Sequence, residues 1–228
     1  MDALERLSGI GIEVLHRADA VLVAGGAPVG DPIWALSRAV GALPGDALEF
    51  GLKLDPAPLR VAATQLRGDA DRFARRREWL AADLSGVWEG SGAEAFAARW
   101  GALSAYIGGG GEPESITGRL RATAAYADAL ADWSEGLRGE LAEAVARVAT
   151  SAEAVTMRGE PVGEGLPSAA VIEAAARIGV RVLQPVADAF GVAQDLLARW
   201  SPELVELRYT EPTTGATGAG TPTTRVAL

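Results

Sequence analysis

The sequence predicts an all-α protein, built as an elongated antiparallel helical hairpin or bundle with flanking N- and C-terminal helices. Through the middle of the chain, apolar residues recur at alternating steps of four and three, which is the spacing of helices packed nearly parallel to each other. A convincing alternation of period two is missing, so we expect essentially no sheet. With 49% hydrophobic residues among 228, the chain is apolar enough to bury a core.

The first segment, residues 1–56, is apolar but interrupted by glycine and proline. We expect an amphipathic helix over about residues 3–23 and a shorter one over about residues 32–42. Asp31 is suited to cap the shorter helix, and Pro32 is suited to its first turn. The sequence Pro44-Gly45-Asp46 predicts a further break.

The second segment, residues 57–158, carries the clearest periodicity, and it predicts a helix over about residues 57–87. Its stripe consists of Leu59, Ala63, Leu66, Ala70, Phe73, Arg77, Leu80, Leu84 and Val87. The same rhythm resumes after Trp88-Glu89-Gly90, stops at Gly108–Gly111, and returns from Ser115, a candidate N-cap, as far as Val148. Long helices joined by a short turn lie antiparallel, so this segment predicts a helical hairpin whose second arm has a glycine-rich break.

Beyond this hairpin, residues 159–167 are interpreted as a Gly/Pro linker. The segment 159–209 then continues as a helix over about residues 168–207, with Ser168 as N-cap and a kink at Pro185. The remaining residues, 210–228, are rich in Thr, Gly and Pro, and we expect them to be a disordered tail.

Composition disfavours several kinds of active site. Cysteine is absent, which excludes disulfides, thiolate metal sites and cysteine nucleophiles, and His16 is the one histidine. The net charge of −9 disfavours binding to nucleic acid. We therefore expect no catalytic, cofactor-binding or metal-binding residues, and no enzyme. We also expect no cleaved leader, because the first twenty residues are interrupted by charges.

The run WEGSGAEAFAARW carries a family resemblance. A Trp-x-Gly turn between two heptad-patterned helices, with Phe96 and Trp100 downstream, resembles the WXG100 superfamily of helical-hairpin proteins from actinobacterial and Gram-positive type VII (ESX) secretion. The resemblance covers about residues 57–150. It implies that Trp88 and Gly90 form a turn close to the surface that contacts a partner or the secretion machinery. A single lysine among 21 basic residues agrees with a GC-rich, actinobacterial coding bias.

The resemblance implies a non-enzymatic function in protein–protein interaction. The partner would be a protein, in a homo- or hetero-oligomer, such as a WXG100-like protein or a secretion ATPase. The family's export signal, a Tyr followed at the fourth position by Asp or Glu, is not found: Leu130 stands there after Tyr126, Gly110 after Tyr106, and Thr213 after Tyr209. The chain could thus be secreted by a leaderless route, or be a cytoplasmic scaffold or chaperone-like partner of a secreted toxin.

Two further alternatives concern surfaces. The apolar stretches 21–24 and 33–36 either contact a membrane interface or, as we favour, pack against the rest of the chain. The arginine cluster of the first long helix, Arg72 and Arg75–Arg77, is either a patch for an acidic partner or, as we favour, a solvated face paired with nearby acids. We expect cohesion of the hairpin and of its partner from an apolar seam that consists of Leu66, Phe73, Leu80, Leu84, Phe96 and Trp100.

Overall fold

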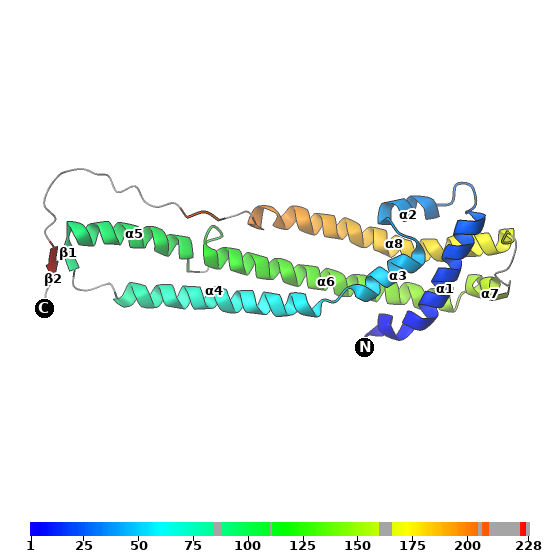
Figure 1. The fold of residues 1–228 in the computed structure, drawn as a ribbon, viewed down its shortest axis with the longest axis horizontal. Coiled ribbons are helices and arrows are strands. Elements are labelled where there is room, and N and C mark those ends of the chain that lie inside the picture. The colour runs from blue at the N-terminus through cyan, green and yellow to red at the C-terminus, as the bar shows by residue number, and fades with distance from the viewer. Residues whose placement is uncertain (84–87, 110, 160–165, 205–206, 210–223, 227–228) are drawn as a thin grey trace. The chain divides into compact units, whose positions relative to one another are not determined.

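The computed structural model describes residues 1–83, 88–109, 111–159, 166–204, 207–209 and 224–226, and most of these are helical (Figure 1). The elements are α1 Ala3–Gly25, α2 Ile33–Val40, α3 Pro44–Lys53, α4 Ala57–Asp83, β1 Trp88–Gly90, α5 Ser91–Ile107, α6 Ile116–Ala149, α7 Ala152–Gly159, α8 Ala169–Trp200, the 3-10 helix η1 Pro202–Leu204, and β2 Thr224–Val226. The predicted all-α class is confirmed. The chain forms two compact units.

Unit 1 comprises residues 1–58 and 129–197 and holds the main hydrophobic core. Side chains from six helices meet there. The largest buried ones are Leu4, Leu15, Leu22, Ile33, Leu48, Leu137, Leu141, Val145, Val148, Met157, Ile178 and Leu183. The apolar rhythm that was predicted to run from Ser115 to Val148 is buried here at Leu137, Leu141 and Val148. The apolar stretches around Leu22 and Ile33 also pack into this core, which agrees with the favoured interpretation for them.

Local sequence signals start several of these helices where the sequence predicts. The Asp31 carboxylate accepts the amide N–H of Ile33 at 2.9 Å, but the N-cap residue of α2 is Pro32, one residue after the predicted cap. Ser115 Oγ accepts the amide N–H of Gly118 at 3.1 Å, and Ser168 Oγ accepts that of Val171 at 3.4 Å. These bonds satisfy amides that have no partner inside the first turn of a helix.

One predicted break is wrong, because α3 begins at Pro44 itself. Proline is tolerated at the first helical position, where an amide N–H would have no partner within the helix. The next amide, of Gly45, donates to the Asp19 carboxylate of α1 at 3.0 Å. This tertiary hydrogen bond stabilises the start of a helix at residues whose types are typical of a turn.

The long C-terminal helix differs from the prediction at its end. α8 spans Ala169–Trp200 and passes through Pro185, whereas we expected a helix to about residue 207. Most of the linker 159–167 and most of the predicted tail lie outside the described residues. The described part of the tail, Thr224–Val226, forms β2, which pairs antiparallel with β1. This pairing is a short exception to the expectation of no sheet.

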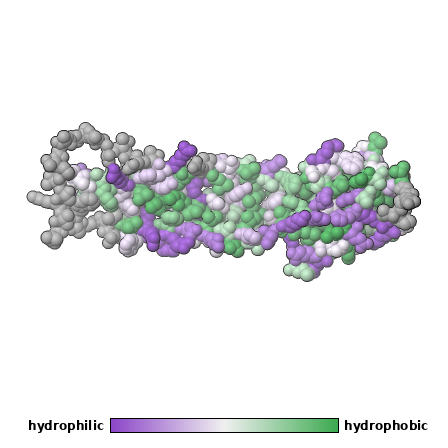
Figure 2. Space-filling view, in the orientation of Figure 1, coloured by the Kyte–Doolittle hydropathy of each residue, from purple (hydrophilic) through white to green (hydrophobic). Residues whose placement is uncertain are grey.

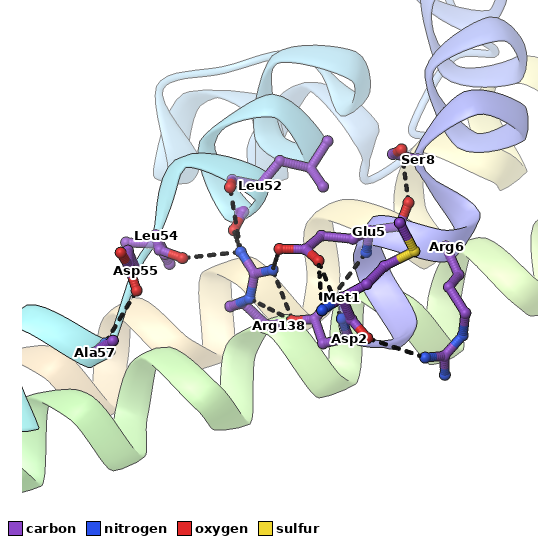
Figure 3. A network of polar contacts seen from close by, with 11 residues as sticks. Met1, Asp2, Glu5, Arg6, Ser8, Leu52, Leu54, Asp55, Ala57 and Arg138 are labelled. Carbon is purple, nitrogen blue, oxygen red and sulfur yellow. Dashed lines mark hydrogen bonds and ion pairs between the residues drawn. The ribbon is translucent and has the colours of Figure 1, made fainter.

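A buried arginine joins α6 to the first helices within unit 1 (Figure 3). Arg138 on α6 is only 7% exposed. Its guanidinium donates to the carbonyl oxygens of Gly51 and Leu54, both at 2.8 Å, and of Leu52 at 3.2 Å. It also donates through Nε to the Asp2 carboxylate at 2.7 Å. Arg138 thereby caps the C-terminus of α3 and holds the N-terminus of α1.

The compact units do not follow the segments 1–56, 57–158 and 159–209 that composition suggested. The second part of α6, residues 129–149, belongs to unit 1, since its apolar stripe packs with α1 and α8. Unit 2 comprises residues 59–128 and 198–228. It contains most of α4, the whole of α5 and the first part of α6, and it is the unit that includes the Trp-x-Gly turn.

Candidate interaction surface

Ion pairs between α4 and the first part of α6 define the hairpin of unit 2. Arg67 and Arg60 of α4 both pair with Asp128, the second at 3.6 Å. Further along α4, Asp71 pairs with Arg121 at 2.9 Å. Residue numbers rise along α4 while those of their partners fall along α6, so the two helices run antiparallel. The chain between them reverses at β1, and α5 runs opposite to α4 (Figure 1).

The interior of this hairpin consists of small side chains. The buried apolar residues between α4 and α6 are Ala63, Ala124 and Ala127, against which Leu66 packs. Ala70 and Ala74 of α4 are also buried. Since alanine adds little volume, the interior of unit 2 offers little apolar area for burial. The larger apolar side chains of α4 and α5 lie mainly at the surface.

Within the chain, the predicted seam is buried only in part. Phe73 is 44% exposed, and the buried position beside it is Ala74. A stripe of period 3.5 drifts by about 20° per heptad on a straight helix of 3.6 residues per turn. Beyond Ala70 the buried position has therefore shifted by one residue, from Phe73 to Ala74. Leu66 and Leu80 are half-buried, and Leu84 lies outside the described residues.

Gly90, at the predicted turn, has a backbone conformation that favours glycine. Its φ is 102°, in the region where a side chain is strained, and it is the N-cap residue of α5. Trp88 and Gly90 are the ends of β1, whose register places Trp88 opposite Val226 and Gly90 opposite Thr224. The structure describes Trp88 only through its backbone.

The whole of α5 is described, and none of its side chains is buried. Phe96 is 37% exposed, Leu103 is 39% exposed and Trp100 is half-buried. In the part of Figure 2 that shows α4 and α5, apolar side chains gather between the two helices in this view, and hydrophilic ones gather along the outer edge of α4. We call the exposed apolar side of α5, with Phe96, Trp100 and Leu103, the α5 face.

The glycine-rich break after α5 is closed by its own side chains. Glu112 accepts the amide N–H groups of Gly109 at 2.9 Å and Gly111 at 3.2 Å. Gly108 has a φ of 76°, and a Cβ there would lie 2.1 Å from Ser115 Oγ. The amides that could hold an external anion are thus bound to a carboxylate from the same loop.

Two polar groups of unit 1 deserve comparison with an active site. Asp19 lies next to His16, whose Nε2 is 3.2 Å from Glu49 Oε1. Burial raises the pKa of Asp19 to about 6, and neighbouring Asp46 adds to this, while the Gly45 amide opposes it. The second group is Arg138, whose donors are engaged as described above, beside a pocket of about 680 Å³. Among the described residues, no group of three or more His, Asp or Glu could hold a metal ion.

Trp79, which is 65% exposed on α4, is not among the predicted site residues. It lies outside the predicted seam and follows the arginine cluster by two residues. A tryptophan on the polar face of a helix, next to three arginines, is a signal that could have identified it. Of that cluster, Arg72 pairs with Asp69, while Asp71 pairs across to Arg121.

Comparison with known proteins adds no relative: no family model, no curated protein and no solved structure matches the chain. Within the described residues, no helix is both long enough and apolar enough to cross a membrane. The functional interpretation therefore depends on the geometry of unit 2 and on the residues of its turn.

Proposed function

We propose that this chain is a non-enzymatic protein-interaction protein, resembling the WXG100-type substrates or partners of type VII secretion. The observation that carries the proposal is the composition of unit 2. Its interior is lined by alanine, while Phe96, Trp100 and Leu103 remain at least partly accessible on α5. A surface of this kind gains stability when another polypeptide covers it.

The geometry of the turn supports the same proposal. An antiparallel return about Gly90, at a positive φ, is what the Trp-x-Gly resemblance implies for a hairpin. Burial of apolar surface contributes about 25 cal/mol per Å². Three side chains such as Phe96, Trp100 and Leu103 can therefore contribute up to several kcal/mol of apolar burial to a complex.

The proposal is tested by co-purification of the tagged full-length chain from its native host, with mass spectrometry of both cell lysate and culture filtrate. We expect a type VII component or a second helical-hairpin protein to co-purify. The variant Trp88→Ala/Gly90→Ala should lose this partner. Unchanged partner recovery together with a lower melting temperature would show that the turn acts only in folding.

A second candidate function is a cytoplasmic scaffold or chaperone-like partner of a secreted toxin. The observation that favours it is the missing Tyr-x-x-x-Asp/Glu signal. The same fractionation separates the two candidates. Recovery in culture filtrate supports an exported substrate, whereas recovery only in lysate, bound to a toxin, supports the scaffold. Flotation with liposomes would instead support a membrane-interacting protein.

A further inference from the structure

An open groove of about 1010 Å³ has all of its described lining residues on α4. Its apolar part is made by Phe73, Trp79 and Leu80, and its charged part by Asp69, Arg72, Arg75 and Arg76. The spacings of three and four residues place these side chains on one side of the helix. We call this surface the α4 groove.

The charges of the α4 groove contrast with the rest of the chain. Three arginines and one aspartate line it, so the groove is locally basic, whereas the chain carries a net charge of −9. Arg72 is paired with Asp69. Among the described residues, neither Arg75 nor Arg76 has a hydrogen bond or ion pair, and both are exposed. Asp71, which lies between Asp69 and Arg75 in sequence, is bound to Arg121 of α6.

An occupant of this groove must satisfy both parts of it. A free anion would pair with the arginines but leave Trp79 and Phe73 in water. An anionic membrane would also face the acidic surface around the groove, whereas a single helix would face mainly the groove itself, since charges more than about 10 Å away are largely screened. A helix with apolar residues on one side and acidic residues along the edges would cover the aromatic rings and pair with the arginines.

We propose that the α4 groove is a docking site for an acidic amphipathic helix of a partner protein. The inference goes beyond the proposed function, because it assigns a second surface and the chemistry of its ligand. It depends on neither the Trp-x-Gly turn nor the α5 face, so the two proposals can fail separately. Arg75 and Arg76 provide the charge recognition, and Trp79 and Phe73 provide the apolar contact.

The test uses the full-length chain and two fluorescent peptides of about 20 residues, long enough to form a helix on binding. Both peptides have leucine at heptad positions a and d. One carries glutamate at the flanking positions and the other carries lysine. We expect the acidic peptide to bind at least about tenfold more tightly than the basic one, with an affinity that falls as salt rises.

Matched variants distinguish an effect of the arginines in the α4 groove from an effect of the net charge of the chain. Arg75→Glu/Arg76→Glu takes the net charge from −9 to −13, because each substitution replaces one positive charge with one negative charge. Arg147→Glu/Arg177→Glu makes the same change at exposed positions of unit 1. The first variant should weaken binding of the acidic peptide by at least about tenfold, and the control should change it by less than about twofold.

A second pair of variants tests the aromatic contact. Trp79→Ala should weaken binding of the acidic peptide without changing the melting temperature, because the side chain is 65% exposed in the free protein. Val155→Ala, also at a position 65% exposed, should change neither. Equal affinity for both peptides, or equal loss in the Arg147/Arg177 control, would overturn the proposal. So would binding only to phosphatidylglycerol vesicles, or a dimer of the chain that Arg75→Glu/Arg76→Glu dissociates.

Discussion

Replacing Arg138 with methionine removes a buried guanidinium while keeping an apolar stem of similar length. In the native structure this group donates to carbonyl oxygens at the end of α3 and to the carboxylate of Asp2. We expect Arg138→Met to lower the free energy of unfolding of unit 1. The loss should be largest where α1 and α3 are held against α6.

The magnitude follows from the exposure of each partner. The bond to the Gly51 carbonyl is buried, and leaving such an acceptor without a partner costs about 1–3 kcal/mol. The bonds to the Leu52 and Leu54 carbonyls are partly buried and add about 1 kcal/mol together. Asp2 is 45% exposed, so water replaces most of that interaction. The expected loss is about 3 kcal/mol.

Urea denaturation followed by circular dichroism measures this loss, and hydrogen exchange of peptides from α1 and α3 locates it. Arg147→Met is the matched control, since Arg147 is 63% exposed and its one ion pair among the described residues is with Glu143, four residues earlier. That control should lose less than about 0.5 kcal/mol. A loss below about 1 kcal/mol in Arg138→Met, or equal losses in the two variants, would refute the assigned role of Arg138.

Three further predictions concern single positions. The folded pKa of Asp19, about 6, exceeds its ordinary value, so the free energy of unfolding should fall as the pH rises from about 4 to about 6. Relative to the Asp19→Asn variant, the native chain should lose about 1 kcal/mol more over this range, a value already reduced for partial exposure of the carboxylate. A difference between the two proteins that does not change with pH would contradict this. Ala70→Leu overfills the buried α4 interior and should cost about 1–3 kcal/mol, whereas Ala81→Leu, at an exposed position, should cost almost nothing in thermal unfolding. Gly108→Ala should destabilise unit 2, because position 108 has a positive φ and a Cβ there would collide with the Ser115 side chain. Gly101→Ala, inside a helix and next to open space, should instead raise the free energy of unfolding by about 0.5–1 kcal/mol. A change of the same sign in both variants would contradict the described loop.

Periodicity predicted most of the helices, because the apolar stripes of α1, α6 and α8 bury against one another within unit 1. α3 could not be predicted from its own residues. Its first turn contains Pro44 and Gly45, and the hydrogen bond that satisfies the Gly45 amide comes from a carboxylate 26 residues earlier. The role of Arg138 could not be predicted either, since its partners lie between 84 and 136 residues away in sequence.

The candidate surface was predicted in outline but not in detail. Gly90 could be placed at the turn from its residue type and its neighbours, and its positive φ agrees. The seam could not be placed, since the same heptad spacing allows either Phe73 or Ala74 to face α6, and the structure buries Ala74. Pairing of Asp71 with Arg121, rather than with the arginine cluster beside it, also depends on a contact across helices.

The proposed function requires that unit 2 presents an apolar surface for another polypeptide. A photo-crosslinking amino acid at Leu103, which is 39% exposed on the α5 face, tests it most directly in cells of the native host. The matched control carries the crosslinker at Val192, which is 52% exposed on α8 in unit 1. We predict a discrete protein adduct from position 103 that is absent from position 192. Uncrosslinked chain at both positions, or the same adducts from both, would contradict the claim.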